Sequence, residues 1–410
     1  MSENYYTQTP NFVSSVSSDV DPRTRLFSFS TLLGTLTGNN GMGPDFPVNI
    51  NYSPTSASNY WNMGIGTSLG LSMYNRQSGD LYLESGEMFK VNDTGSQPVI
   101  LHQKIRTVVF TRINDETYRV IEQDGSLTEL QDVAGDGLFR PVQRCSPLGY
   151  ALYLNWKYDA VGFVLASVSD DTGDTLCTFE YDGYGETTVH FFPGCTEAYY
   201  VTLSTLNNYL TDIRHTGMEQ DYAWHLDYDD VGMGDGLLTL IRVTTPTGLV
   251  KEALYNYGTT TGLMHFPDEA GLPPLPAVTQ LTIRPGQGQP DMVTLYSATE
   301  DNNDNNVAFR NYLGYAFNLG SGWSPDSDNM YAMLDPDYLY QTIVTQRAQE
   351  DGLSDIKNVY TYNNYHLLQQ TEITQNGTRH LTEMDYYAQP YQEFDDQPAQ
   401  CLFPRKQTLT

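Results

Sequence analysis

The chain has 410 residues, of which 39% are hydrophobic, enough to form a core at this length. Its 50 Asp and Glu residues against 21 Lys and Arg give a formal net charge of −29. A surface this acidic repels phosphate backbones and anionic lipid, so we expect no nucleic-acid partner and no adsorption to acidic membranes. The charge favours simple solubility, with cationic partners or a divalent metal as the alternatives.

Residues 1–20 are polar and rich in serine, and we expect a flexible lead-in. The start, Met1 to Tyr6, has neither a basic region nor an apolar run, so it does not match a secretory signal peptide. No stretch approaches the roughly 20 apolar residues needed to span a bilayer. We therefore expect synthesis in the cytoplasm and secretion by a specialised system that does not read a cleavable signal.

Residues 21–95 form the second predicted segment. Residues 26–30 and 46–52 alternate between apolar and polar positions, which is the two-residue period of half-buried strands. The glycine-rich stretch 38–44 between them has the chemistry of a turn. Residues 81–91 read as a hairpin that turns at Ser85-Gly86.

Residues 96–265 carry the most informative pattern of the chain. A Tyr-Asp pair with a glycine shortly after it occurs three times: Tyr158-Asp159 with Gly162, Tyr181-Asp182 with Gly185, and Tyr228-Asp229 with Gly232. The first two tyrosines are 23 residues apart and the next gap is 47, close to two such periods. This spacing indicates an array of one repeated unit, in which the tyrosine lies on a strand and Asp and Gly supply the turn. Each repeat is then a β-hairpin.

Residues 266–277 interrupt this pattern because they are rich in proline and lack a period. From 278 to 410 the strand pattern resumes, with weakened copies of the motif at Tyr362-Asn363 and Tyr386-Tyr387. We find no convincing long amphipathic helix. The sequence predicts an all-β, curved and spiralling antiparallel sheet of hairpins, and its abrupt end predicts part of a larger shell with an uncapped final strand.

The repeats resemble the Rhs/YD-repeat family of large bacterial proteins, which includes polymorphic toxins and components of insecticidal toxin complexes. The opening is similar to that family's first region at Asp21 to Thr24, Gly41 to Pro44 and Gly64 to Gly66. Two positions depart from the family pattern: Arg25 replaces a usual glycine and Thr67 a common tryptophan. The likeness covers essentially the whole chain.

The resemblance implies a shell of β-sheet that encloses a toxic C-terminal polypeptide or a partner toxin. Such shells end in a self-cleaving plug with an Asp-Pro-x-Gly signature. Asp335-Pro336-Asp337-Tyr338 begins in the same way but lacks the glycine, so this chain is similar to an early part of a shell. Family members act in bacterial competition and are often labelled sugar-binding.

Several residue patterns offer chemistry, and each has a simpler explanation. Gly66-Thr67-Ser68-Leu69-Gly70 matches a serine-hydrolase elbow, but strand-like residues follow it where a helix is required. The acidic stretches 170–174 and 301–306 could bind calcium, yet neither has the twelve-residue loop pattern, so solvated turns are favoured. We expect buried free thiols and no zinc site at the four cysteines, Cys145, Cys177, Cys195 and Cys401.

The sequence therefore predicts a non-enzymatic scaffold with no catalytic residue, no cofactor and no metal site. Its expected partners are a toxin cargo or the rest of the shell. An acidic lining would hold a basic cargo. The alternative is a secreted or surface carbohydrate-binding protein, in which a few exposed coplanar aromatic rings would stack on sugars.

Overall fold

Antiparallel strands make up nearly all the regular structure of this computed structural model, which describes residues 19–216, 222–234, 236–255, 262–298, 310–316, 322–349 and 352–410. Within these ranges the helical elements are short 3-10 turns of three or four residues: η1 (Asn39–Gly41), η3 (Asp268–Ala270), η5 (Asn329–Ala332) and η6 (Phe394–Asp396). The all-β prediction and the prediction of little helix are confirmed. Frequent turn residues explain the result, since glycine and proline recur too often for long helices.

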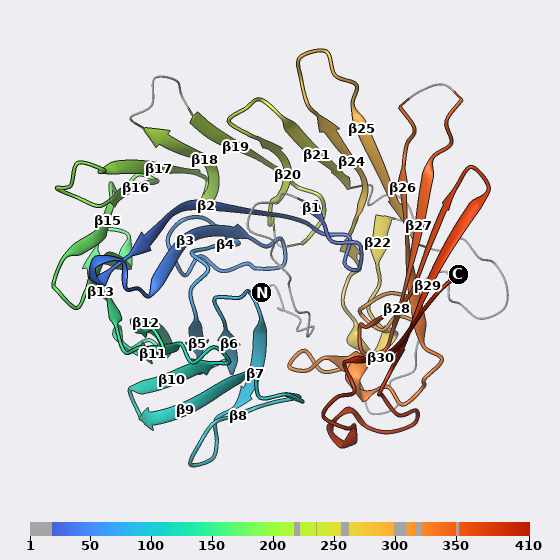
Figure 1. Ribbon diagram of the computed structural model, residues 1–410, viewed down its shortest axis with the longest axis horizontal. Coiled ribbons are helices and arrows are strands. Elements are labelled where there is room, and N and C mark those ends of the chain that lie inside the picture. The colour runs from blue at the N-terminus through green and yellow to red at the C-terminus, as the bar shows by residue number, and fades with distance from the viewer. Residues whose placement is uncertain are drawn as a thin grey trace. The chain divides into compact units, whose positions relative to one another are not determined.

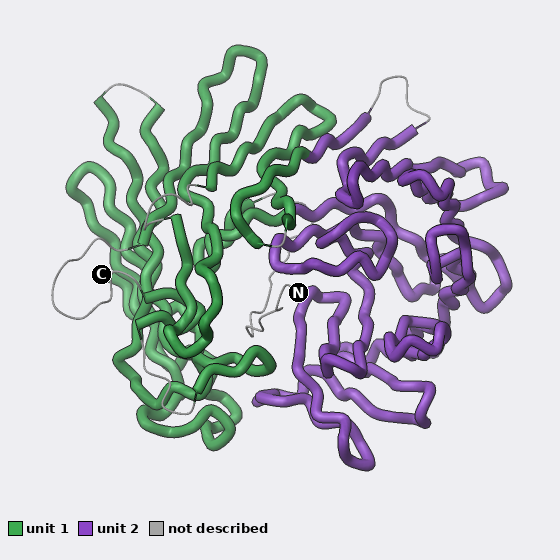
Figure 2. Tube along the Cα trace, turned by 180° about the vertical axis from the view of Figure 1, so that it is seen from behind, with its two compact units in different colours: residues 1–7, 18–28, 227–410 green, residues 8–17, 29–226 purple. Residues whose placement is uncertain are grey.

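The chain divides into two compact units, which Figure 2 shows in separate colours. Unit 2 comprises residues 8–17 and 29–226, and unit 1 comprises residues 1–7, 18–28 and 227–410. The segment boundaries that the sequence predicts, including the lead-in to residue 20, stay predictions, and most of that lead-in lies outside the described residues.

Unit 2 opens with a small sheet and a short meander that precede its main array. The small sheet contains β2 (Phe27–Thr37), β3 (Asp45–Tyr52) and β4 (Thr67–Ser68). Strand β2 begins in unit 1 and continues into unit 2. The meander contains β5 (Met73–Asn75), β6 (Asp80–Tyr82), β7 (Met88–Asn92) and β8 (Val99–Ile100).

The main array of unit 2 is an up-and-down ladder in which each strand pairs with the next along the chain. Its strands are β9 (Val108–Asn114), β10 (Thr117–Glu122), β11 (Leu127–Gln131), β12 (Leu138–Cys145), β13 (Ala151–Asp159), β14 (Gly162–Asp170), β15 (Thr175–Tyr181), β16 (Glu186–Phe191), β17 (Tyr199–Leu206), β18 (Tyr209–Thr216) and β19 (Tyr222–Asp229). β12 also pairs with β5. In Figure 1 the array bends steadily from β9 through β13 to β18, so the sheet of this unit is strongly curved.

Unit 1 contains β1 and a second up-and-down ladder. Its strands are β1 (Asp19–Val20), β20 (Thr239–Thr244), β21 (Val250–Tyr255), β22 (Leu263–Met264), β23 (Leu275–Pro276), β24 (Val278–Arg284), β25 (Met292–Ser297), β26 (Leu339–Gln346), β27 (Ile356–Asn363), β28 (Leu368–Gln375), β29 (Thr378–Tyr386) and β30 (Pro404–Leu409). β21 pairs directly with β24, so the proline-rich stretch and the β22–β23 hairpin lie outside the ladder.

Each unit has its own core. In unit 2 an aromatic cluster fills the space between the meander and the first strands of the array, where the Tyr118 ring lies 4.7 Å from Phe139 and 5.1 Å from Tyr74. In unit 1 a cluster around Met330, Tyr338 and Tyr340 packs the loops against β26 and β27. Aromatic contacts of this kind add to the free energy gained by removing apolar surface from water.

Candidate functional site

The first Tyr-Asp motif forms a tight hairpin at the tip of β13 and β14. Asp159 pairs with Gly162, so only two residues make the turn. The Asp159 carboxylate accepts the Ala160 N–H at 2.6 Å and pairs with Lys157 at 2.8 Å. Tyr158 is 72% exposed, and its ring contacts Phe163 edge-on with a centroid distance of 4.8 Å.

The second motif forms the next hairpin tip, between β15 and β16. Asp182 Oδ1 accepts the N–H groups of Tyr184 at 2.7 Å and Glu186 at 2.9 Å. These backbone hydrogen bonds lower the pKa of the Asp182 carboxyl. Gly185 has φ +111°, and its carbonyl accepts the Thr205 N–H of β17 at 2.7 Å. The motif therefore shapes the turn and joins it to the following hairpin.

The third motif ends β19. Asp229 Oδ1 accepts the Asp230 N–H at 2.8 Å, and Asp230 Oδ1 accepts the Gly232 N–H at 2.9 Å, while Gly232 has φ +87°. Tyr228 is half-buried. The sequence Tyr255-Asn256-Tyr257-Gly258 is a looser copy of the motif, and all of it after Tyr255 lies outside the described residues.

Because alternate strands of an up-and-down ladder run the same way, the ends of β13 and β15 lie at one edge of the sheet. A Cβ placed on Gly183 would lie 3.7 Å from the Ala160 Cβ, so these two tips are neighbours. The tyrosines differ in environment, however: Tyr158 is exposed, whereas Tyr181 is half-buried and burial raises its pKa. The spacing of Tyr158, Tyr181 and Tyr228 predicts equivalent positions on their hairpins, with the tyrosines packed along one face, and this stays a prediction.

A hydroxyl contact recurs at the ends of these strands. The hydroxyl of Tyr181 donates to the Leu165 carbonyl on the preceding strand at 3.1 Å, and that of Tyr386 donates to the Leu368 carbonyl at 2.8 Å. Tyr158 makes a longer contact of 3.4 Å with the Ala134 carbonyl. Each tyrosine hydroxyl thus links the end of its strand to the backbone of a segment that precedes it in the chain, which is a structural role.

The hydrolase-like stretch does not have the geometry of a nucleophile elbow. Thr67 and Ser68 form β4, which pairs with β3, and the next element along the chain is the strand β5. An elbow requires a helix after the serine. Thr67 is buried.

The acidic stretch 170–174 is a turn that anchors another loop. Asp170 is 4% exposed, and its carboxylate accepts hydrogen bonds from the Asn39 N–H at 2.7 Å and the Asp174 N–H at 3.1 Å. The Thr172 hydroxyl and N–H also donate to it. All the hydrogen-bond donors to the Asp170 carboxylate named here are backbone or side-chain groups of the protein itself. The second acidic stretch, residues 301–306, lies outside the described residues.

Among the described residues, no group of three or more His, Cys, Asp or Glu side chains is arranged to hold a metal ion. The four cysteines are free thiols, as expected, but only Cys177 and Cys401 are buried. Cys195 is exposed and Cys145 is half-buried, so the prediction of burial is wrong for these two, because both lie where a strand has ended or is ending.

The strands β28 to β30 of unit 1 present a surface that is not among the sites predicted from the sequence. Residues directly opposite each other in an antiparallel ladder point to the same face. One such row runs from Tyr296 through Val344, Asn358 and Ile373 to His380. The exposed fraction rises along it from 6% at Tyr296 and Val344 to 39% at Ile373. The face that is buried in the core on β25 to β27 therefore continues onto β28 and β29, where it is exposed to solvent.

A second row shows the same change. It runs from Thr342 through Tyr360, Thr371 and Thr382 to Leu409. Thr342 is 2% exposed and Leu409 is 73% exposed. We call this face of β28 to β30 the open face; its residues, none of them buried, are Thr371, Ile373, Gln375, Thr378, His380, Thr382, Met384, Gln407 and Leu409.

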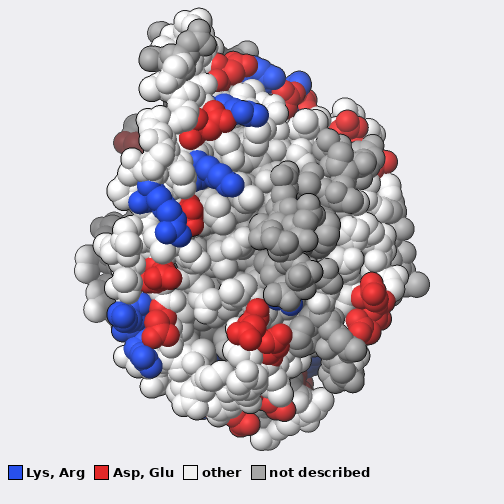
Figure 3. All heavy atoms as spheres, turned by 90° about the vertical axis from the view of Figure 1, so that its right-hand side faces the viewer, with Lys and Arg blue, Asp and Glu red and all other residues white. Residues whose placement is uncertain are grey.

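Charge is segregated across these strands. The open face has no Asp, Glu, Lys or Arg among its residues. The opposite face, which we call the far face, has Gln370, Glu372, Thr374, Arg379, Leu381, Glu383, Asp385, Lys406 and Thr408. Arg379 pairs there with Glu372 at 2.9 Å. Figure 3, which views the molecule from the side where β26 to β30 lie, shows acidic and basic atoms side by side within a mostly uncharged surface.

A buried network lies elsewhere in unit 1. The Tyr340 hydroxyl is hydrogen-bonded to His366 Nδ1 at 2.9 Å, and His366 Nε2 donates to Asp328 Oδ2 at 2.9 Å. Asp328 also accepts the Met330 N–H at 3.0 Å. All three side chains are buried, and the adjoining cavity has a volume of only about 20 Å³, room for one water. The network thus links η5 to β26 and the turn before β28.

No protein-family model matches the sequence, and no curated protein matches it significantly. Among solved structures, the chain is similar to one described as TcdB2-TccC3-Cdc42, with a TM-score of 0.32 and 11% identity over 91% of this chain and 25% of that chain. It is also similar to the Photorhabdus luminescens Tc holotoxin pore, with a TM-score of 0.31 and 10% identity over 99% of this chain and 24% of that chain. The chain spans about a quarter of the length of each. At this level of similarity, neither match identifies a family for the chain.

Proposed function

We propose that this chain is a non-enzymatic scaffold that forms part of an Rhs/YD-repeat shell and encloses a toxic polypeptide or a partner toxin for delivery. The open face of β28 to β30 is the observation that carries the proposal. It continues the core face of β25 to β27, yet it is uncovered and uncharged in a chain of net charge −29. A surface of this kind fits a partner that covers it.

The hairpin ladder suits such a role for a physical reason. Each strand satisfies its backbone hydrogen bonds on its neighbours, so a wall can extend by adding hairpins without a new core. Threonine, glutamine and methionine on the open face can contact an extended polypeptide without selecting for its charge. The sequence suggested an acidic lining, but the open face in this part of the wall has no Asp or Glu among its residues. On this proposal, the protein is made in the cytoplasm and leaves the cell through a specialised secretion system.

Protection from proteolysis tests this proposal. An unstructured, protease-sensitive polypeptide is joined after Thr410 and digested beside the same polypeptide joined to an unrelated β-sheet protein. We expect slower cleavage when it is joined to this chain, because the wall shields it. Cleavage at equal rates would contradict the proposal.

A matched pair of variants separates enclosure from a general effect of the fusion. The open-face variant carries Ile373→Lys and Leu409→Lys, and the far-face control carries Leu381→Lys and Thr408→Lys. Both add two positive charges, one on the β28–β29 hairpin and one on β30. We expect only the open-face variant to lose protection, with circular dichroism confirming that both remain folded.

A further inference from the structure

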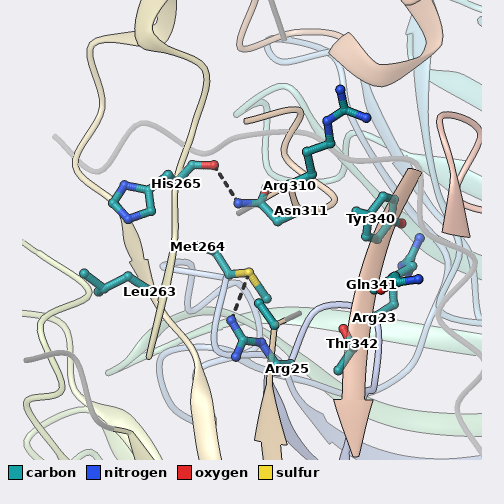
Figure 4. Close-up of a pocket in the computed structure, with 11 residues that line it drawn as sticks. Arg23, Arg25, Leu263, Met264, His265, Arg310, Asn311, Tyr340, Gln341 and Thr342 are labelled. Carbon is teal, nitrogen blue, oxygen red and sulfur yellow. Dashed lines mark hydrogen bonds between the residues drawn. The ribbon is translucent and has the colours of Figure 1, made fainter. Parts of the chain in front are cut away.

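The small cavity of unit 1 is part of the core. Figure 4 shows the Arg25 guanidinium donating to Met264 Sδ at 3.4 Å and the Asn311 amide donating to the His265 carbonyl at 3.0 Å. The cavity volume of about 20 Å³ leaves room for one water and for no larger ligand. A surface that a larger partner can reach lies instead in unit 2.

One edge of the main array of unit 2 presents a row of five hairpin tips. Alternate turns of an up-and-down ladder lie at the same edge, so the turns that follow β9, β11, β13, β15 and β17 are neighbours. We call this edge the rim; it comprises residues 113–117, 132–137, 158–162, 181–186 and 205–209.

Hydrogen bonds and packing contacts join each tip of the rim to the next. The Asp132 N–H donates to the Glu116 carbonyl at 3.3 Å, which joins the first two tips. The Tyr158 hydroxyl contacts the Ala134 carbonyl at 3.4 Å, which joins the second to the third. The contacts of the second Tyr-Asp motif, described above, join the remaining tips. The rim is therefore one continuous surface.

Every tip of the rim has an exposed large apolar side chain. The exposed fraction is 72% for Tyr158, 95% for Tyr184 and 64% for Leu206, and it is 49% for Ile113 and 36% for Val133. A row of exposed apolar groups on the surface of a folded protein marks an interaction site, and tyrosine is enriched at such sites.

The turns at the opposite edge of the same array differ from the rim. Those that the structure describes comprise residues 123–126, 146–150, 171–174 and 192–198. Among these described turns, Leu148 is the only exposed large apolar side chain. Both edges consist of turns between antiparallel strands, so the need to form turns does not explain the apolar residues of the rim.

The rim is also acidic. Lys157 pairs with Asp159 and Arg140 pairs with Asp136, each at 2.8 Å. The other acidic side chains of the rim form no ion pair within the described part of the chain. The five segments contain no Lys or Arg, and their acidic residues are Asp115, Glu116, Asp132, Asp136, Asp159, Asp182 and Glu186. A partner that covers the apolar tips therefore needs basic residues beside its own apolar ones.

The spacing of the tips indicates the shape of the partner. Adjacent strands lie about 4.8 Å apart, so tips that are two strands apart recur about every 10 Å. Residues seven apart in an α-helix lie on the same side and are separated by about 10.5 Å. Residues on one face of an extended strand recur about every 6.6 Å, which does not match the tips. A helix with an apolar residue every two turns matches them.

We propose that the rim binds a basic amphipathic helix of a partner protein. Its apolar side chains contact Tyr158, Tyr184 and Leu206, the three most exposed tips, and its Lys or Arg side chains lie beside the carboxylates of the turns. These tips span about 20 Å, the length of a helix of about 14 residues. The rim belongs to unit 2 and the open face to unit 1, so this proposal and the shell role can fail independently.

Binding of two synthetic peptides to the full chain tests the proposal. Each peptide has about 21 residues, with leucine at every seventh position and alanine elsewhere on the same side. The remaining positions carry lysine in one peptide and glutamate in its twin. Fluorescence anisotropy measures the Kd of each. We expect the lysine peptide to bind and the glutamate twin not to bind. Absence of binding by the lysine peptide, or equal binding of both, would overturn the proposal.

A pair of variants shows whether the lysine peptide binds at the rim. Tyr184→Ser combined with Leu206→Ser removes two apolar tips and keeps every acidic residue. Burial of such side chains contributes enough that we expect the Kd to rise about tenfold or more. Leu148→Ser removes an exposed apolar residue from the opposite edge and should bind as the wild type does. Circular dichroism confirms that both variants are folded. Equal affinities of the two variants would show attraction by charge alone and would refute the site.

Discussion

At the scale of residues, the three parts of the Tyr-Asp motif have separate structural roles. Asp182 accepts the N–H groups of its turn, Gly185 supplies a backbone that other residues avoid, and the hydroxyl of Tyr181 reaches a carbonyl on the strand behind. The turn could be predicted from the sequence because its chemistry is local. The hydroxyl partner could not, because it lies on another strand whose register the sequence does not determine.

Gly185→Ala should destabilise the fold by about 2 kcal/mol. The glycine has φ +111°, and an added Cβ would lie 2.8 Å from the Thr205 carbonyl oxygen. Chemical denaturation measures the loss. Gly95→Ala is the matched control in the same unit, since its φ is ordinary and its nearest contact is 3.4 Å. Equal effects of the two substitutions would show that Gly185 is not constrained.

Tyr340→Phe should lower the free energy of unfolding by about 1–3 kcal/mol, because it leaves a buried His366 nitrogen without its hydrogen bond. Tyr184→Phe, at a side chain that is 95% exposed, should have almost no effect. Thermal or chemical unfolding of the two variants distinguishes these outcomes. A loss of stability no greater than that of the control would mean that the network contributes nothing.

At the scale of elements, the loop that contains η1 docks on the array of unit 2 through hydrogen bonds of Asn39, one of them to the Asp170 carboxylate. Asp170 holds the Asn39 N–H, and the Asn39 side chain donates to the Ala151 carbonyl at 3.1 Å. Gly38 is needed at this contact, because a Cβ there would lie 2.6 Å from Leu152. The sequence predicted both turns, but not their contact, because they are more than a hundred residues apart.

Asp170→Asn should weaken this docking in a way that depends on pH. Burial opposes ionisation of Asp170, but hydrogen bonds from Thr172, Asn39 and Asp174 outweigh it and lower the carboxyl pKa. The carboxylate therefore stabilises the fold fully above its unfolded pKa of about 4, and this contribution is lost as pH falls through the lower folded value.

Chemical denaturation near pH 7 and near pH 3 measures this linkage. The wild type should be more stable than Asp170→Asn at neutral pH, and the difference should shrink in acid. Glu116→Gln, at an exposed carboxylate, is the control and should leave the pH profile unchanged. A difference that stays constant with pH would contradict the role assigned to the charge.

One property of the open face could have been predicted from the sequence, and another could not. Charged residues occupy alternate positions at Glu372, Arg379, Glu383 and Asp385, and this alternation could have shown that one face is uncharged. The strand pattern from residue 278 was predicted on the same basis. The sequence could not show that the neutral face is exposed to solvent. A strand whose neutral face is covered by another part of the protein has the same alternation of charged and neutral residues.

At the scale of the whole molecule, a net charge of −29 acts against self-association while the open face favours it. Salt shortens the screening length from about 10 Å at 0.1 M to about 3 Å at 1 M. We expect dimers or larger assemblies at high ionic strength, measured by light scattering. The open-face variant should remain monomeric, whereas the far-face control should associate as the wild type does. A wild-type chain that is monomeric at both ionic strengths would contradict this expectation.

Neighbouring residues of β28 offer the most direct test of the central claim, that the open face covers a polypeptide. Ile373 lies on the open face and Glu372 on the far face. A photo-crosslinking amino acid is placed at either position in a chain that carries the unstructured polypeptide after Thr410, and the products are mapped by mass spectrometry. Crosslinks to the polypeptide from position 373 and not from position 372 are the predicted result. Crosslinks from both positions equally, or from position 372 alone, would contradict the account.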